Sequence, residues 1–276
     1  MFTLSGFADE ISSDLETQVS VLKELNIDYL ELRGLWDKNV LDLTEEEIER
    51  VKSKLDEASV SVSAIGSPVG KIGIEEDFEK HIDRFERALY LAGRFNADYI
   101  RIFSYYIPEK GEPEEYRDEV LRRMRIKTEM AEDYGKILLH ENEREIYGDV
   151  PVRCREILET IRSDNLRAIF DPANFIAVGV QPYPDAYEEL KEYIEYLHIK
   201  DAKFGGEVEI KPAGEGDGRI GKTLKELKES GFDGFLSLEP HLSIAGRKKG
   251  FSGPEAFEVA AKCLKEVIEE AGGRYK

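Results

Sequence analysis

Cysteine and long apolar stretches are both scarce in this chain of 276 residues. Cys154 and Cys263 are its two cysteines, and they lie far apart without a CxxC motif, which excludes a disulfide framework or a cysteine-based zinc site. No run of 18 apolar residues could span a bilayer. The first residues, Met-Phe-Thr-Leu-Ser-Gly-Phe, lack the basic and apolar regions of a signal peptide. We therefore predict a cytoplasmic protein with no membrane partner.

Basic residues are also few relative to acidic ones. The chain has 39 Lys and Arg against 58 Asp and Glu, which gives a net charge of −19. Such a surface repels a phosphate backbone, so a nucleic-acid partner is not expected. The apolar fraction of 41% is that of a globular protein.

Strand-like and helix-like segments alternate along the whole chain, as in parallel α/β folds. Amphipathic stretches such as Ile48, Val51 and Leu55 separate the strands, and no Pro/Gly/Ser linker divides the chain. We predict one (β/α)8 TIM barrel over residues 1–276, with an open doubly wound sheet as the alternative. The eight predicted strands are 3–7, 29–33, 60–65, 99–103, 137–141, 168–171, 194–199 and 234–238.

Four consecutive predicted strands end on residues that can bind a metal ion: Glu141, Asp171, His198 and Glu239. In a barrel the strand ends surround one mouth, and neighbouring strands lie only about 4.8 Å apart. Three carboxylates and one imidazole would suit a single divalent cation, Mn²⁺ first, with Zn²⁺, Co²⁺ or Mg²⁺ as alternatives. For any one of these acids, capping the next helix is the competing interpretation.

The motifs at these strand ends resemble those of the xylose-isomerase-like TIM-barrel superfamily of sugar-phosphate isomerases and epimerases. The matching segments are Glu141-Asn142, Asp171-Pro172, His198-Ile-Lys200-Asp201, Gly214-Glu-Gly-Asp217 and Leu238-Glu239, and the resemblance covers essentially the whole chain. It implies that Glu141 and Glu239 bind the metal and also act as the catalytic pair. One would remove the proton next to a substrate carbonyl, and the other would return a proton on the opposite face.

One position departs from the family pattern. Asn174 stands where many members have a histidine, and the loop 206–214 contains no histidine. The three-zinc cluster of the related apurinic endonucleases therefore cannot be built here, and endonuclease activity is not expected. Asn174 becomes a candidate for substrate binding instead.

Other residues near the predicted mouth could also contact a substrate. Lys200 could neutralise an enolate or phosphate, or pair with Asp201 at the surface. His241 follows Glu239 with the same strand parity, and Arg247 lies in the basic segment 246–250 before a predicted helix start, where barrels often bind phosphate. Simple exposure of these loop residues is the alternative.

The leading hypothesis is a metal-dependent isomerase or epimerase that acts on a small carbohydrate or its phosphate. A dehydratase of an inosose or keto acid would use the same metal and enolate chemistry. A non-catalytic sugar-binding barrel is the third interpretation, and the sequence leaves a homo-oligomeric assembly open.

Overall fold

The computed structural model describes residues 1–205, 208–242 and 252–276. Eight parallel strands form a nearly closed barrel in the order β1-β12-β9-β8-β7-β6-β5-β2. The seam lies between β1 and β2, which are linked by a single bridge from Phe7 to Glu31. The strands are β1 (Thr3–Gly6), β2 (Tyr29–Leu32), β5 (Ser61–Ile65), β6 (Tyr99–Ile102), β7 (Ile137–Glu141), β8 (Leu166–Phe170), β9 (Ile194–Ile199) and β12 (Phe235–Leu238).

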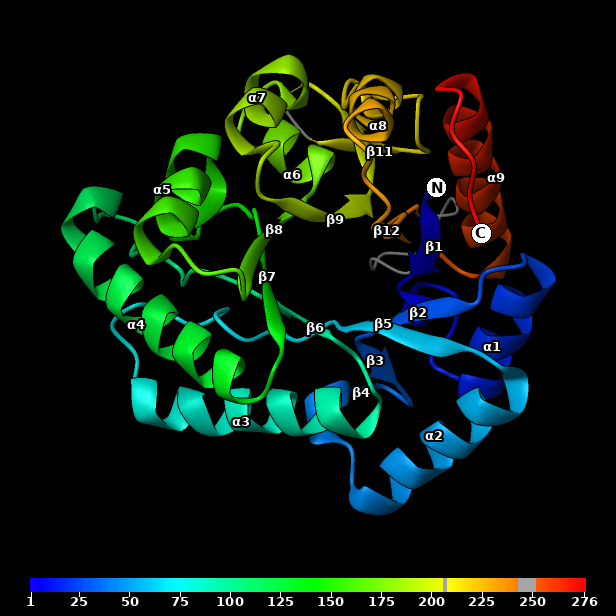
Figure 1. Cartoon of the computed structure of the whole chain (residues 1–276), viewed down its shortest axis with the longest axis horizontal. Helices are drawn as coiled ribbons and strands as arrows, with labels where there is room; N and C mark the ends of the chain where they lie inside the picture. The colour runs from blue at the N-terminus through cyan, green and yellow to red at the C-terminus, as the bar shows by residue number, and fades with distance from the viewer. Residues whose placement is uncertain (206–207, 243–251) are drawn as a thin grey trace.

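The helices surround this barrel on its outside (Figure 1). They are α1 (Leu15–Glu24), α2 (Glu45–Ala58), α3 (Phe78–Arg94), α4 (Pro113–Asp133), α5 (Pro151–Ile161), α6 (Pro172–Ala177), α7 (Tyr187–Leu190), α8 (Ile220–Glu229) and α9 (Pro254–Glu270). Four short helical turns, η1 (Ala8–Glu10), η2 (Val40–Asp42), η3 (Tyr147–Asp149) and η4 (Pro182–Ala186), lie in the connections. The predicted TIM barrel is therefore confirmed. No helix in the described part of the chain is long and apolar enough to cross a bilayer.

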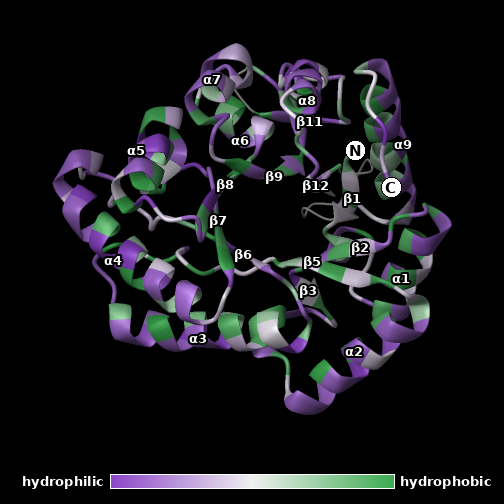
Figure 2. Cartoon of the chain, in the orientation of Figure 1, coloured by the Kyte–Doolittle hydropathy of each residue, from purple (hydrophilic) through white to green (hydrophobic). Residues whose placement is uncertain are grey.

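The apolar residues form two layers on either side of the strands. The large outer layer packs the helices against the sheet, and the helices turn their polar faces outward (Figure 2). A small inner cluster fills the barrel itself, with Ala64, Leu139, Ile169 and Tyr196 as its buried members. The inner cluster closes the barrel interior below its C-terminal mouth, where the polar residues of the strand ends gather.

Local sequence explains where several elements begin. Thr44 and Glu47 form a capping box that starts α2, and the Asp14 side chain accepts a hydrogen bond from Thr17 N–H at the start of α1.

The segment 201–218, which the sequence suggests is a loop, contains an antiparallel hairpin of β10 (Asp201–Lys203) and β11 (Glu209–Lys211). A second small hairpin, β3 (Gly34–Leu35) with β4 (Lys38–Asn39), follows β2.

Candidate metal centre

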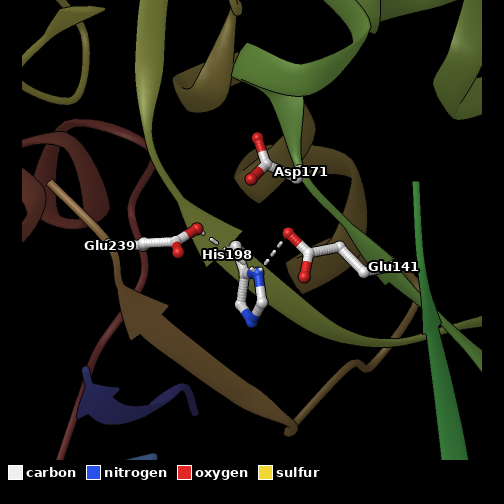
Figure 3. A group of neighbouring side chains, drawn as sticks. All are labelled: Glu141, Asp171, His198 and Glu239. Carbon is white, nitrogen blue, oxygen red and sulfur yellow. Dashed lines mark ion pairs between the residues drawn. The ribbon is translucent and has the colours of Figure 1, made fainter. Parts of the chain in front are cut away.

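Glu141, Asp171, His198 and Glu239 converge at the mouth of the barrel. One ligand atom from each lies within 4.8 Å of those of the other three. All four residues are buried, with exposed fractions of 3% or less. Figure 3 shows Glu141 and Glu239 approaching from opposite sides of the cluster, with Asp171 and His198 between them. The four side chains that the sequence pattern singles out are thus brought together.

Asp171 caps a helix and still presents one carboxylate oxygen to the cluster, so the two interpretations that the sequence leaves open are compatible. It follows β8 directly and is the N-cap of α6, because its Oδ1 accepts a hydrogen bond of 3.0 Å from Asn174 N–H. The β8 strand ends one residue earlier than predicted because Asp171 begins the cap. Its second oxygen, Oδ2, remains directed at the cluster, 2.9 Å from Lys200 Nζ.

The two ring nitrogens of His198 face different carboxylates. Nδ1 lies 3.0 Å from Glu141 Oε1 and 3.8 Å from Glu239 Oε2. Nε2 lies 3.2 Å from Glu31 Oε2, on strand β2. The ring also contacts Phe7 edge to face at a centroid distance of 5.0 Å. Side chains of the barrel interior therefore contact both nitrogens and the ring of His198, and they fix its position.

Cationic side chains surround Glu239. Its Oε1 accepts a 2.7 Å hydrogen bond from Arg33 Nη1, and its Oε2 accepts one of 2.9 Å from Lys200 Nζ. His241 Nε2 lies 3.4 Å from Oε1. Arg33 also pairs with Asp9 and Glu10, so that Glu239 belongs to a network that joins the ends of β12, β1 and β2.

Glu141 has neutral and cationic partners on the opposite side. Arg101 Nη1 lies 3.2 Å from its Oε2, and Asn174 Nδ2 donates to its Oε1 at 3.2 Å. Asn174 also donates to Asn142 O at 2.9 Å. Because Arg101 donates further hydrogen bonds to the carbonyl oxygens of Gly66 and Ser67, its guanidinium is fixed beside Glu141.

The ionisation of the cluster reflects burial and close opposite charges. Burial lowers the pKa of His198, but Glu141 and Glu31 raise it more strongly, to about 10. Burial raises the pKa of Asp171 to about 6 although Lys200 opposes the shift. For Glu141, burial is outweighed by His198 and Arg101, which lower the pKa to about 2. Without a cation, protonated His198 and Lys200 therefore neutralise the acids.

Two buried atoms of the cluster support metal binding. Asp171 Oδ2 and His198 Nδ1 make no hydrogen bond of normal geometry within the described residues, although both have charged neighbours. A buried polar atom without a well-formed hydrogen bond is costly, and a cation at the centre would give each of these atoms a direct bond in place of its ion-pair contact. The donor set of three carboxylates and one imidazole suits a hard or borderline divalent ion. The residues present therefore fit a divalent cation.

The other predicted site residues have different outcomes. Asn174, Lys200 and His241 all lie at the cluster, in the contacts given above, and the surface pair of Lys200 with Asp201 is not formed. Asp201 instead turns away and accepts hydrogen bonds from four backbone amides, those of Ala202, Gly214, Gly216 and Gly218. Arg247 lies outside the described residues.

Three further residues contact the cluster: Glu31, Arg33 and Arg101. The sequence identifies Glu31 and Arg33 only as residues that could reach the mouth, and it does not identify Arg101. Glu31 lies in β2, Arg33 is the first residue after β2, and Arg101 lies in β6. Their positions at or near the C-terminal ends of strands mark them only as candidates, because each partner belongs to a distant strand.

An open cavity of about 1100 Å³ begins beside Arg33 and His241 and extends between η1 and the β3–β4 hairpin.

Comparison with known proteins agrees with this architecture. A family model described as xylose isomerase-like TIM barrel matches residues 19–267. The chain belongs to this family. It is 24% identical over 226 residues to a 3-dehydroshikimate dehydratase of Bacillus anthracis, which covers 76% of this chain and 79% of that protein.

Solved structures show the same fold at low sequence identity. A D-tagatose 3-epimerase-like protein superposes with a TM-score of 0.79 at 22% identity and covers 98% of both chains. The IOLI protein, described with a bound zinc atom, has a TM-score of 0.80 at 18% identity and covers 98% of this chain and 99% of its own. Among the proteins that are similar to this chain, one is thus described as 3-epimerase-like and another as a dehydratase.

Proposed function

We propose that the chain is an enzyme that uses one divalent cation, Mn²⁺ by preference, to isomerise or epimerise a sugar or sugar phosphate. The observation that carries this proposal is the placement of Glu141 and Glu239 on opposite sides of one buried donor cluster (Figure 3). A substrate bound between them would present one face to each carboxylate. Proton removal on one face and return on the other inverts a carbon centre.

The proton next to a carbonyl is too weakly acidic for a carboxylate to remove unaided at neutral pH. A divalent cation supplies positive charge next to the substrate oxygens, which stabilises the enediolate that develops as the proton leaves. Lys200 and Arg101 lie against the two glutamates and are placed to add to this stabilisation. The Nδ2 group of Asn174 donates to Glu141 and to Asn142 O, and its Oδ1 can accept a hydrogen bond from a substrate hydroxyl.

Isotope exchange with solvent tests the proposal. The Mn²⁺-loaded protein is incubated in D₂O with aldoses, ketoses, their phosphates and inososes, and deuterium incorporation is followed by NMR. We expect the wild type to exchange one carbon-bound proton of its substrate and to form product, and Glu141→Gln and Glu239→Gln to lose product formation at saturating Mn²⁺. Metal occupancy of each variant is measured first, so that loss of the base is separated from loss of the ion.

Glu195→Gln is the matched control, because Glu195 lies on β9 like His198 but pairs with Tyr99 OH at 2.8 Å, away from the cluster. This variant should retain exchange. Undiminished product formation by a metal-saturated Glu141→Gln or Glu239→Gln protein would show that the two-glutamate mechanism is wrong.

A dehydratase is the second candidate, favoured by the similarity to the Bacillus anthracis protein over 226 residues. The same proton removal would then be followed by loss of a β-hydroxyl group instead of proton return. The two reactions differ in product, because dehydration of a keto acid or inosose creates an enone that absorbs in the ultraviolet. Incubation with 3-dehydroshikimate and with inososes, followed by absorbance, distinguishes them.

A further inference from the structure

Glu31 is a buried acid from the strand opposite the metal cluster. Its exposed fraction is 0%, and among the described residues its side-chain hydrogen-bond contacts both go to His198 Nε2, at 3.2 Å from Oε2 and 3.4 Å from Oε1. A buried carboxylate is expensive unless it is paired. Among the described residues, the His198 imidazole is therefore the one group close to the Glu31 carboxylate that can carry a positive charge or donate a hydrogen bond.

The backbone around Glu31 places the carboxylate below the imidazole. The register between β2 and β5 shifts between Leu30 and Glu31, so that Ser63 is the extra residue of a bulge. Ser63 Oγ bonds to Leu30 O at 3.1 Å and lies 2.9 Å from Tyr196 OH. Bulges commonly redirect side chains beside functional sites. Here the bulge accompanies a polar layer directly beneath the cluster.

The two nitrogens of His198 therefore face different kinds of partner. Nε2 faces an acceptor that is not part of the donor cluster, whereas Nδ1 faces Glu141 and Glu239. In a neutral imidazole one nitrogen carries the proton and the other has the free lone pair. If Nε2–H donates to Glu31, the lone pair is on Nδ1 and is directed into the cluster.

We propose that Glu31 is a positioning residue that fixes the ring orientation and the tautomer of His198, so that Nδ1 is presented to a divalent cation. The inference rests on the metal-binding part of the proposed function and is independent of the reaction catalysed. Carboxylates that accept the second N–H of a metal-binding histidine typically change metal affinity 10- to 100-fold. The negative charge of Glu31 would also offset part of the positive charge of a cation at Nδ1, because the imidazole lies between the two.

Metal titration of the full-length protein after chelation tests the proposal. Affinity for Mn²⁺ is measured by calorimetry for the wild type, Glu31→Gln, Glu31→Ala and Tyr196→Phe. We expect Glu31→Ala to bind about 10- to 100-fold more weakly. Glu31→Gln, which keeps an acceptor oxygen but not the charge, should fall between Glu31→Ala and the wild type. Far-ultraviolet circular dichroism of each metal-free variant verifies that it is folded.

Tyr196→Phe is the matched control for a change in the same buried layer. It removes one hydroxyl beside Ser63, and the Tyr196 ring lies 5.9 Å from the His198 ring without a hydrogen bond to it. Its affinity for Mn²⁺ should be that of the wild type. Equal weakening by Tyr196→Phe, or unchanged affinity in both Glu31 variants, overturns the proposal. A wild type that binds no Mn²⁺, Zn²⁺, Co²⁺ or Mg²⁺ would instead refute the metal site itself.

The tautomer can be read directly by NMR. The chain has four histidines, so ¹⁵N-histidine labelling gives a small set of signals that single substitutions assign. In the Zn²⁺-loaded wild type we expect the His198 signals of a protonated Nε2 and a metal-bound Nδ1. Metal bound to Nε2 would contradict the assignment, even in a protein whose Glu31 variants fail to fold.

Discussion

Lys127 on helix α4 is a buried amine whose removal should change the pH dependence of stability in a predictable direction. Its exposed fraction is 0%, and its Nζ donates a 3.3 Å hydrogen bond to Phe103 O and lies 4.6 Å from the centre of the Tyr105 ring. No carboxylate forms an ion pair with it among residues 1–205, 208–242 and 252–276. Burial, with a further contribution from Arg123, lowers the pKa of Lys127 from 10.5 to about 7.

The magnitude follows from proton linkage. Below pH 7 both the folded and unfolded chains carry the proton, and the cost of burying the ammonium is constant. Between pH 7 and 10.5 the unfolded chain binds more protons, so the free energy of unfolding rises with pH. Each pKa unit corresponds to about 1.4 kcal/mol, so Lys127 should contribute a gain of about 3 kcal/mol between pH 6 and 9, most of it above pH 7.

Replacement of Lys127 by methionine removes the titrating group while keeping a side chain of similar length. We expect Lys127→Met to exceed the wild type in unfolding free energy at pH 6 to 7, and this advantage should shrink by about 3 kcal/mol by pH 9. Urea unfolding in the presence of a chelator measures it. Chelation prevents the metal cluster from adding its own proton linkage.

Lys80→Met is the control, because the Lys80 side chain is 84% exposed on helix α3. Its difference from the wild type should not vary with pH. If the difference between Lys127→Met and the wild type is also constant from pH 6 to 9, then the Lys127 amine is not held neutral by burial, and the reasoning is wrong.

Two further substitutions test how charges are held near the mouth. Asp201→Asn replaces a carboxylate that accepts four backbone N–H groups, and should lower the unfolding free energy by about 3 kcal/mol in urea titrations; unchanged stability would contradict the anchoring role. Lys200→Met removes the amine that pairs with Asp171 and Glu239. It should lower the Tm of the metal-free protein while Mn²⁺ restores it, and a Tm that Mn²⁺ does not raise would contradict charge compensation at this position.

Features with a local cause could be predicted from the sequence. The apolar periodicity of 48, 51 and 55 gives a buried face on α2, and the Thr44 capping box marks its first turn. The parity of a strand determines which residues point inward, so His198 and Lys200 were both expected at the mouth and both contact the cluster. The candidate ligands are predictable because each lies within one residue of the C-terminal end of its own strand.

The β10–β11 hairpin was not predicted, for an identifiable reason. The segment 201–218 contains glycines and charged residues but no long alternating run. Its structure depends on Asp201, whose carboxylate is fixed within the segment by amides 13 to 17 residues away. A Cβ on Gly216 would approach Asp201 Oδ1 to 2.3 Å, so this glycine is required by the close approach of a side chain. Such contacts have no signature in local periodicity.

The partners of the candidate metal ligands could not be assigned from the sequence because they depend on closure of the barrel. Arg33 reaches Glu239 across 206 positions of sequence, and Glu31 reaches His198 across 167. Glu31 lies in β2 and Arg33 directly follows it, and β2 is the strand that is joined to β1 by a single bridge. A sequence pattern can place a residue at a strand end but cannot state which strand closes the circle.

This seam connects stability with the site. Glu10 pairs with Arg33 at 2.9 Å and with His241 Nδ1 at 2.9 Å, and it accepts a 3.0 Å hydrogen bond from the Ser252 hydroxyl just before α9. With only one backbone bridge between β1 and β2, these side chains supply much of the contact that holds the mouth closed there. Because Arg33 also binds Glu239, closing the barrel and positioning this ligand depend on the same interactions. The side chains that join β1 and β2 at the C-terminal mouth therefore also position part of the candidate metal centre.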